Sequence, residues 1–358
     1  MWRLLLACSI TLSVACGVGF EEGRAGGGGS GGRGEASSTV GATTGAGGSP
    51  AGNPSTASSG GQGQGGMGDG GEGVGATTPV ALASGQSTPD TVVVDDTHVY
   101  FTNTGDGSVA KVPKAGGAVV ALADKDGNPK GIAVDATHVY WAAQSSGTLW
   151  RVPIGGGTPE VFASGQTGIR HVALTDDLVF WTNNVSSGAV MRMSKSGGSS
   201  VTVVSGQNEP AAIAVDATHV YWTNAGSGEV RRCALAGCAP EVLADGPGSP
   251  LRIHVDATNV YWTTYLAETA LQVPLAGGTP ITLASGLGEI VGVVADGGYV
   301  YLAARYDNPG QIVRVPVGGG LLQVVAEGQG QPAGLAQDAK YLYWANGTDG
   351  TVMKLAKP

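Results

Sequence analysis

Charged side chains are scarce in this sequence, and no part of its predicted folded region is strongly basic. Asp, Glu, Lys and Arg make up 13% of the 358 residues, with 19 basic against 28 acidic side chains and a formal net charge of −9. Binding to nucleic acid needs a concentrated basic surface, and adhesion to anionic lipid headgroups needs a basic cluster. We therefore expect no nucleic-acid partner and no direct adhesion to lipid.

Long hydrophobic runs are missing as well. The apolar stretch at residues 4–15 follows Arg3 and is too short to cross a bilayer as a helix, which takes about 20 residues. One positive charge before a short apolar core is typical of a secretory signal peptide, here residues 1–15. The stretch ends in LSVAC, which resembles the bacterial lipobox, although Ser13 stands where Leu is usual.

The resemblance to the lipobox implies that Cys16 carries a diacylglycerol. Cys8 also follows a lipobox-like sequence, but cleavage there would leave an apolar core of only a few residues. We therefore expect a lipoprotein of the bacterial cell envelope, at the outer membrane or cell surface rather than the inner membrane, with membrane contact only through the anchor. The alternative is an ordinary cleaved signal peptide in which Cys16 has no role.

Aromatic residues are almost absent from residues 17–77, where Phe20 is the only one. This segment consists mostly of Gly, Ser, Ala and Thr, and cannot bury enough apolar surface to offset its conformational entropy. We expect a disordered tether over residues 16–77, starting at the lipidated cysteine, and one folded domain over residues 78–358.

Cysteine is rare, and two of the four residues lie in the N-terminal export region. Cys233 and Cys238 remain, five positions apart around a glycine-containing turn. Because an exported protein meets an oxidising compartment, we expect these two residues to form a disulfide. A metal site is the alternative, but the sequence near this pair offers no further Cys or His ligand.

A segment of eight residues recurs through the folded region and predicts its architecture. Its first copies lie at residues 94–101, 134–141 and 174–181, and each ends in a large apolar residue. These residues are spaced 40 to 42 apart: Phe101, Trp141, Trp181, Trp222, Trp262, Leu302 and Trp344.

Each repeat divides into four short strands, as in residues 131–135, 138–142, 148–154 and 159–163 of the second copy. These stretches alternate apolar and polar residues and are separated by Gly and Asp turns. Four strands at this period predict an all-β fold, a seven-bladed β-propeller of four-stranded blades.

The two ends of the repeat array predict how the ring closes. Residues 78–85 read like the fourth strand of a blade, as at residues 279–286, whereas the last repeat stops after its third strand. Pairing residues 79–84 with the strand near residues 351–356 would complete the seventh blade and remove both open edges.

The repeat resembles known propeller families. Val220-Tyr221-Trp222-Thr223-Asn224, followed by a glycine turn, is similar to the YWTD repeat of lipoprotein-receptor propellers and to the NHL and YVTN repeats of bacterial surface and sensor proteins. The resemblance covers residues 78–358 and implies the fold, as in uncharacterised propeller-repeat surface lipoproteins. YWTD receptors have six blades and this chain has seven repeats, so their binding residues are not transferred.

Departures from the repeat mark the candidate binding residues. The innermost strand of each blade should carry small residues near the axis, yet His171 and Arg252 occupy such positions and Arg170 precedes one of them. Two long loops of the same face add aromatic and charged residues. The candidate binding set is Arg170, His171, Arg252, Tyr265, Glu268, Arg305, Tyr306 and Asp307. A polar, water-filled channel mouth with no ligand is the alternative.

Nothing in the sequence marks a catalytic, cofactor or metal site. Its predicted folded region contains no Gly-x-Ser-x-Gly elbow and no phosphate-binding loop. We expect a non-catalytic, monomeric binding propeller without a cofactor, whose ligand is a protein, a glycan or a small molecule. The alternative is a propeller lyase or lactonase, with or without a metal ion, that uses His171 with Glu209 or Glu289 at the channel mouth.

Overall fold

The computed structural model describes residues 78–124, 127–246, 248–305 and 309–358. The chain divides into two units, residues 1–69 and 70–358, and every described residue belongs to the second. The predictions for residues 1–77, including Cys16 and the tether, lie outside the described residues. Within the described residues, no helix is long and apolar enough to span a membrane.

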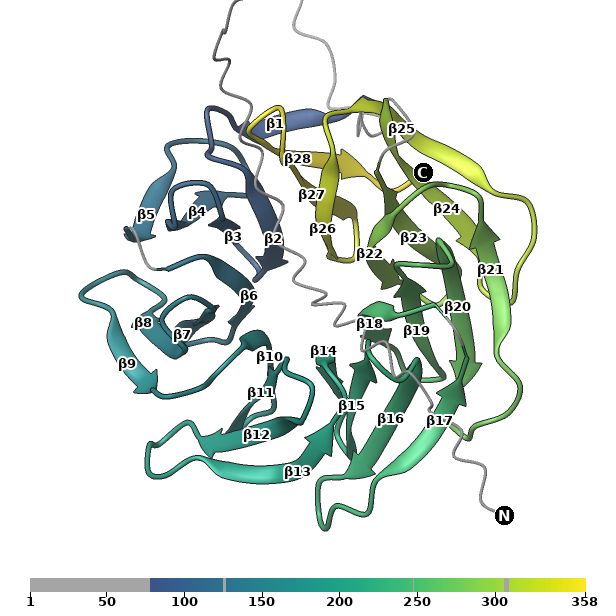
Figure 1. Cartoon of the computed structure of the whole chain (residues 1–358). Helices are drawn as coiled ribbons and strands as arrows, with labels where there is room; N and C mark the ends of the chain where they lie inside the picture. The colour runs from purple at the N-terminus through teal and green to yellow at the C-terminus, as the bar shows by residue number, and fades with distance from the viewer. Residues whose placement is uncertain (1–77, 125–126, 247, 306–308) are drawn as a thin grey trace, which may run out of the picture. The chain divides into compact units, whose positions relative to one another are not determined.

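Seven antiparallel sheets of four strands surround a common centre, which confirms the predicted all-β seven-bladed propeller (Figure 1). We call the strands of each blade A to D from the centre outward. Blades one to three are β2–β5 (Pro89–Val94, His98–Asn103, Val109–Pro113, Val120–Ala123), β6–β9 (Pro129–Val134, His138–Ala143, Thr148–Pro153, Glu160–Ala163) and β10–β13 (Ile169–Leu174, Leu178–Asn183, Gly188–Ser194, Val201–Gln207).

The remaining blades follow the same plan. Blades four to six are β14–β17 (Pro210–Val215, His219–Asn224, Glu229–Ala234, Glu241–Asp245), β18–β21 (Pro250–Val255, Asn259–Thr264, Thr269–Pro274, Ile281–Ser285) and β22–β25 (Ile290–Ala295, Tyr299–Ala304, Gly310–Pro316, Gln323–Gln329). Blade seven consists of β26–β28 (Pro332–Gln337, Tyr341–Asn346, Thr351–Ala356) and β1 (Val80–Ala83).

The predicted closure is present in blade seven. Strand β1 pairs antiparallel with β28, placing Val80 opposite Lys354 and Ala83 opposite Val352 (Figure 1). The first described strand therefore supplies the outermost strand of the last blade and covers its edge.

The ring has two faces with different connections. On the face that we call the loop face, the D-to-A loops bond to the B-to-C loops, as from Ala225 N to Glu209 O at 3.0 Å. On the opposite turn face, the C-to-D turns bond to the A-to-B turns, as from Leu235 N to Thr218 O at 2.8 Å. The described chain enters β1 on the turn face, because the far end of β1 bonds from Gln86 N to Gly350 O of a B-to-C loop.

The repeated aromatic residues form the core and join the blades. Trp181 and Trp222 are fully buried. Each donates its indole N–H, at 2.9 Å, to a glutamine of the preceding blade, either Gln166 just after the D strand or Gln207 at its end. Buried indole N–H groups need such partners. Trp344 makes the same bond to Gln329, so in three blades the tryptophan of the column also ties its blade to the preceding one.

The predicted disulfide is also present. Cys233 and Cys238 are bonded, with their Cα atoms 4.9 Å apart. Cys233 ends up almost fully buried in β16, while Cys238 belongs to the turn that leads to β17. The bond therefore fixes the C-to-D turn of blade four.

Candidate functional site

Neighbouring A strands approach one another so closely that most blades require a small residue there. A Cβ atom on Gly131 would lie 2.6 Å from the carbonyl oxygen of Arg170, and one on Gly334 would lie 2.7 Å from that of Asp90. Real side-chain carbons do not come this close, so these positions exclude any side chain. His171 and Arg252 occupy the corresponding positions of blades three and five.

His171 and Arg252 contact each other across blade four. Arg252 Nη1 lies 2.8 Å from His171 Nε2, and Arg252 Nε donates to the carbonyl oxygen of Val291 at 2.9 Å. Blade four carries only Ala211 and Ala212 at this level. The small residues of blade four leave room for the two long side chains to meet.

The hydrogen bonds of His171 fix the form of its imidazole ring. Nδ1 lies 2.8 Å from the carbonyl oxygen of Ala211, which can only accept, so Nδ1 carries the hydrogen. Nε2 must then accept from Arg252, because the guanidinium only donates. Burial, reinforced by Arg252 and Arg170, holds the pKa of His171 well below its usual value, so the ring is neutral.

Asp90 is the carboxylate at the centre of this group. Its Oδ1 lies 3.4 Å from Arg305 Nη2, which links blade one to blade six. Burial alone would raise the pKa of Asp90, but Arg252, Arg305 and Lys130 together hold it below its usual value. Asp90 is therefore ionised and neutralises part of the positive charge around it.

Arg170 and Lys130 complete what we call the axial cluster: Asp90, Lys130, Arg170, His171, Arg252 and Arg305. Arg170 makes one weak bond, from Nη1 to the amide oxygen of Asn184 at 3.3 Å. Burial and the neighbouring Arg252 lower its pKa to about 10. The pKa of Lys130 is also lowered, mainly by burial, while Asp90 opposes this effect.

The structure brings only part of the predicted site together. Arg170, His171, Arg252 and Arg305 belong to the axial cluster, whereas Tyr306 and Asp307 lie outside the described residues. Tyr265 bonds through its backbone to Ser249 on the loop face, and neither its side chain nor that of Glu268 has a hydrogen bond or ion pair to the cluster among the described residues.

Two members of the cluster, Asp90 and Lys130, were missing from the predicted site. Both are nevertheless marked in the sequence, because each is a charged residue directly before the axial position of its blade, as Arg170 is. His171 and Arg252 are held by the backbone carbonyl groups of Ala211 and Val291. Every residue has such a carbonyl group, so the sequence gives no sign of these two contacts.

Glu268 keeps the backbone conformation of the repeat but departs from it in its side chain. It has a φ of +50° on the B-to-C loop of blade five, where Gly107, Gly147, Gly228 and Gly350 of other blades also have positive φ. A non-glycine residue in this region costs on the order of 1 kcal/mol and persists where the surroundings require it. The charged side chain therefore replaces a glycine that would relieve the strain.

The remaining polar columns are structural. Asp95 accepts from the backbone N–H of Thr97 and His98 at 2.6 and 2.7 Å, and from the Tyr100 hydroxyl at 2.7 Å. The same A-to-B turn recurs in other blades. It places the residue equivalent to His98, which is also a histidine in blades two and four, on the turn face. Among the described residues, no group of three or more His, Cys, Asp or Glu side chains could hold a metal ion.

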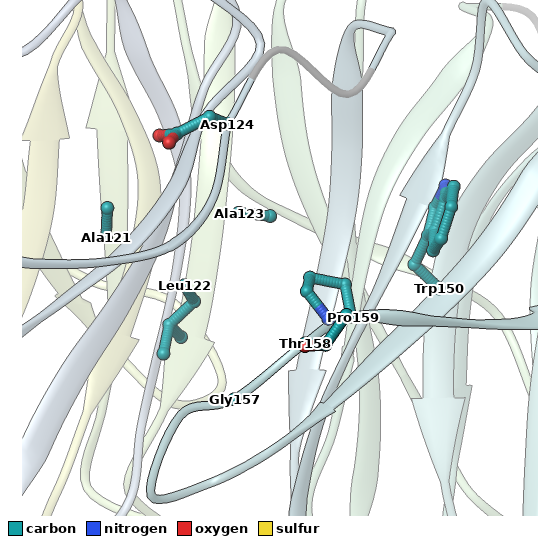
Figure 2. A pocket seen from close by; sticks show the side chains of 8 residues that line it. All are labelled: Ala121, Leu122, Ala123, Asp124, Trp150, Gly157, Thr158 and Pro159. Carbon is teal, nitrogen blue, oxygen red and sulfur yellow. The ribbon is translucent and has the colours of Figure 1, made fainter.

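A separate hollow of about 570 Å³ lies between blades one and two (Figure 2). Figure 2 shows Trp150 and Pro159 on one side of it and Asp124 on another. Leu122, Trp150 and Pro159 are the larger apolar residues of its lining, and no residue of the axial cluster belongs to it.

No protein-family model matches this chain, and no curated protein matches it. Similar solved structures include a streptogramin B lyase (14% identity, 77% of this chain and 96% of that chain, TM-score 0.65). The virginiamycin B lyase of Staphylococcus aureus is similar at 13% identity (78% and 99%, TM-score 0.66), and a chain of a nidogen–laminin complex at 20% (62% and 90%, TM-score 0.52). At such low identity these likenesses show the propeller fold and nothing finer.

Proposed function

We propose that this chain is a non-catalytic binding propeller of the bacterial cell envelope, and that the axial cluster binds an anionic group of its ligand. A signal peptide at residues 1–15, a lipidated Cys16 and a tether over residues 16–77 are part of this proposal. The ligand is a protein, a glycan or a small molecule that carries a carboxylate, phosphate or sulfate.

The observation that carries the proposal is the incomplete pairing of Arg170 and Lys130. Arg170 has five N–H donors and uses one of them on a neutral amide. Lys130 has no ion pair within the described residues, although Asp90 lies near enough to raise its pKa. Desolvated cations that lack direct hydrogen-bond acceptors are unfavourable, and a bound anion would supply the missing acceptors.

The surrounding charges favour an anion over a metal cation. Four cationic side chains, Lys130, Arg170, Arg252 and Arg305, act at this site, and Arg170 and Arg252 lie close to His171. Glu209 and Glu289 offset part of this charge through Arg170 and Arg252 respectively.

Catalysis by His171 would require a change in its contacts. A general base must present a lone pair to the substrate, but Nε2 of His171 accepts from Arg252 and Nδ1 donates to Ala211. A ligand that drew Arg252 away would release the Nε2 lone pair. A measurement of ligand turnover therefore distinguishes the lyase alternative from a binding protein.

The test compares loop-face and turn-face variants in binding to acidic and neutral glycans and peptides on an array. Arg170→Gln combined with Lys130→Gln should weaken binding of acidic ligands at least tenfold, and His138→Ala on the turn face should leave it unchanged. Equal binding by the double variant, or a preference for neutral ligands, would disprove the anion site. Conversion of a captured ligand, lost in His171→Asn, would establish an enzyme instead.

A further inference from the structure

Arg192 in blade three differs from the arginines at the same position in other blades. Arg151, Arg192, Arg232 and Arg314 lie on the C strands of blades two, three, four and six. In the antiparallel register they face Tyr140, Phe180, Tyr221 and Tyr301 of the B strands.

The other three arginines are held by partners on both sides. On the D strand, Arg151 pairs with Glu160 at 2.5 Å and Arg232 with Glu241 at 2.9 Å, while Arg314 bonds Gln323 at 2.8 Å. Each also donates to a carbonyl of the next blade; the acceptors are Lys195, Leu275 and Pro358.

Blade three has lost the partners that would hold Arg192. Val201 stands opposite it on the D strand in place of Glu or Gln. Phe180 has no hydroxyl, whereas the other three blades have a tyrosine at this position. Thr175 stands where other blades have the aspartate that accepts from the tyrosine hydroxyl. No hydrogen bond or ion pair joins Arg192 to any residue that the structure describes.

A groove of about 250 Å³ lies where these partners would be. Its walls include Phe180, Arg192, Thr202, Val220, Leu235 and Cys238. Leu235 is the residue of blade four whose carbonyl corresponds to the acceptors of the other arginines. The Cys233–Cys238 disulfide fixes the turn that forms one wall.

We infer that this groove is a ligand site, separate from the axial cluster, which binds a small organic carboxylate through Arg192. The carboxylate supplies the acceptors that Glu160 and Glu241 provide in blades two and four, since arginine binds carboxylates in a bidentate manner. Phe180 and Val220 are almost completely buried beneath the groove, so the partly exposed Leu235 is the apolar side chain that the body of the ligand would contact. The volume limits the ligand to a small molecule. The site does not depend on the function proposed for the axial cluster.

The test titrates the full mature chain with sodium benzoate and follows the Arg192 Nε–H signal and the backbone amides of residues 234–238 by NMR. Benzamide, which has the same shape without the charge, and inorganic phosphate, which has charge without an apolar body, are the controls. Benzoate should shift these signals with saturation, and both controls should bind at least tenfold more weakly.

Two variants make the result specific to Arg192. Arg192→Gln should weaken benzoate binding at least tenfold with little change in melting temperature, because it removes no internal bond, whereas Arg232→Gln should leave the affinity unchanged. Val201→Glu should also weaken binding at least tenfold and raise the melting temperature, because it rebuilds the pair present in blades two and four.

Three results would overturn the inference. Absence of any shift with benzoate would remove the site. Equal binding of benzamide would make the groove an apolar hollow, and equal binding of phosphate would make it a general anion site. The double variant Arg170→Gln/Lys130→Gln should bind benzoate as the wild type does, so this test and that of the axial cluster fail separately.

Discussion

Tyr221 donates its hydroxyl hydrogen to Asp216 across 2.7 Å, and this bond joins the B strand of blade four to the turn before it. The same pair occurs as Tyr100 with Asp95, Tyr261 with Asp256 and Tyr343 with Asp338. In blade three both members change together, to Phe180 and Thr175, as we expect if the two groups depend on each other.

Removing both members of this pair should cost less than the sum of the costs of removing each alone. Tyr221→Phe should lower the free energy of unfolding by about 1 to 2 kcal/mol, because the partly buried Asp216 carboxylate loses a hydrogen-bond donor. Adding Asp216→Thr, as in blade three, should cost less than the sum of the single changes. Additive costs in a double-mutant cycle by urea unfolding would contradict this coupling.

The free energy of unfolding should decrease as the pH is lowered below neutrality, because of His171. Its pKa is lowered in the folded protein, so below pH ~6.5 the unfolded chain binds a proton that the folded chain does not. The free energy of unfolding then falls by up to about 1.4 kcal/mol per pH unit until the folded pKa is reached.

His171→Gln should flatten this dependence between pH 7 and 5, because Gln can donate to Ala211 and accept from Arg252 without titrating. His254, whose pKa burial also lowers, should preserve part of the slope. Melting temperatures across this range provide the measurement, with His138→Gln as the control. An unchanged slope in His171→Gln would mean that His171 is charged in the folded protein.

Truncation should separate the closing strand from the segment before it. A chain that begins at residue 77 should keep the melting temperature of the full chain, whereas one that begins at residue 85 should melt at least 10 °C lower, because β28 becomes an open edge. Differential scanning calorimetry of the two chains decides the matter. If the two chains have the same melting temperature, β1 contributes nothing to ring closure.

Glu268→Gly should stabilise the protein by about 1 kcal/mol, because glycine adopts the positive φ of this loop without strain. The control is Glu268→Ala, which keeps the strain and removes only the carboxylate. If Glu268 belongs to the binding face, both variants should change ligand affinity alike while differing in melting temperature. A Gly variant less stable than the Ala variant would show that the conformation is not strained.

The fold could be predicted almost completely from the sequence, because the repeat determines which residues share a position in every blade. Closure by β1 followed from one strand too many at the start and one too few at the end. The site was harder to predict. Arg252 stands out against glycine and alanine, but its contact with His171 skips a blade, and backbone carbonyls of Ala211 and Val291 hold both side chains.

Arg192 is a second residue whose position, but not whose contacts, could be predicted from the sequence. The replacement of Glu160 and Glu241 by Val201 is visible in the aligned repeats, whereas the missing bond to Leu235 depends on how two blades sit against each other. The residues that depart from the repeat could be found from the sequence, but the groups that they contact could be identified only from the structure.

The position of β1 also determines how the domain would respond to mechanical load. Any pull transmitted through the N-terminal segment reaches the propeller at Val80, so the few cross-strand pairs between β1 and β28 bear the force before any other blade does. Under tension the ring should therefore open first at its closure and lose blade seven as a sheet of four strands, while the other six blades still have all their strands.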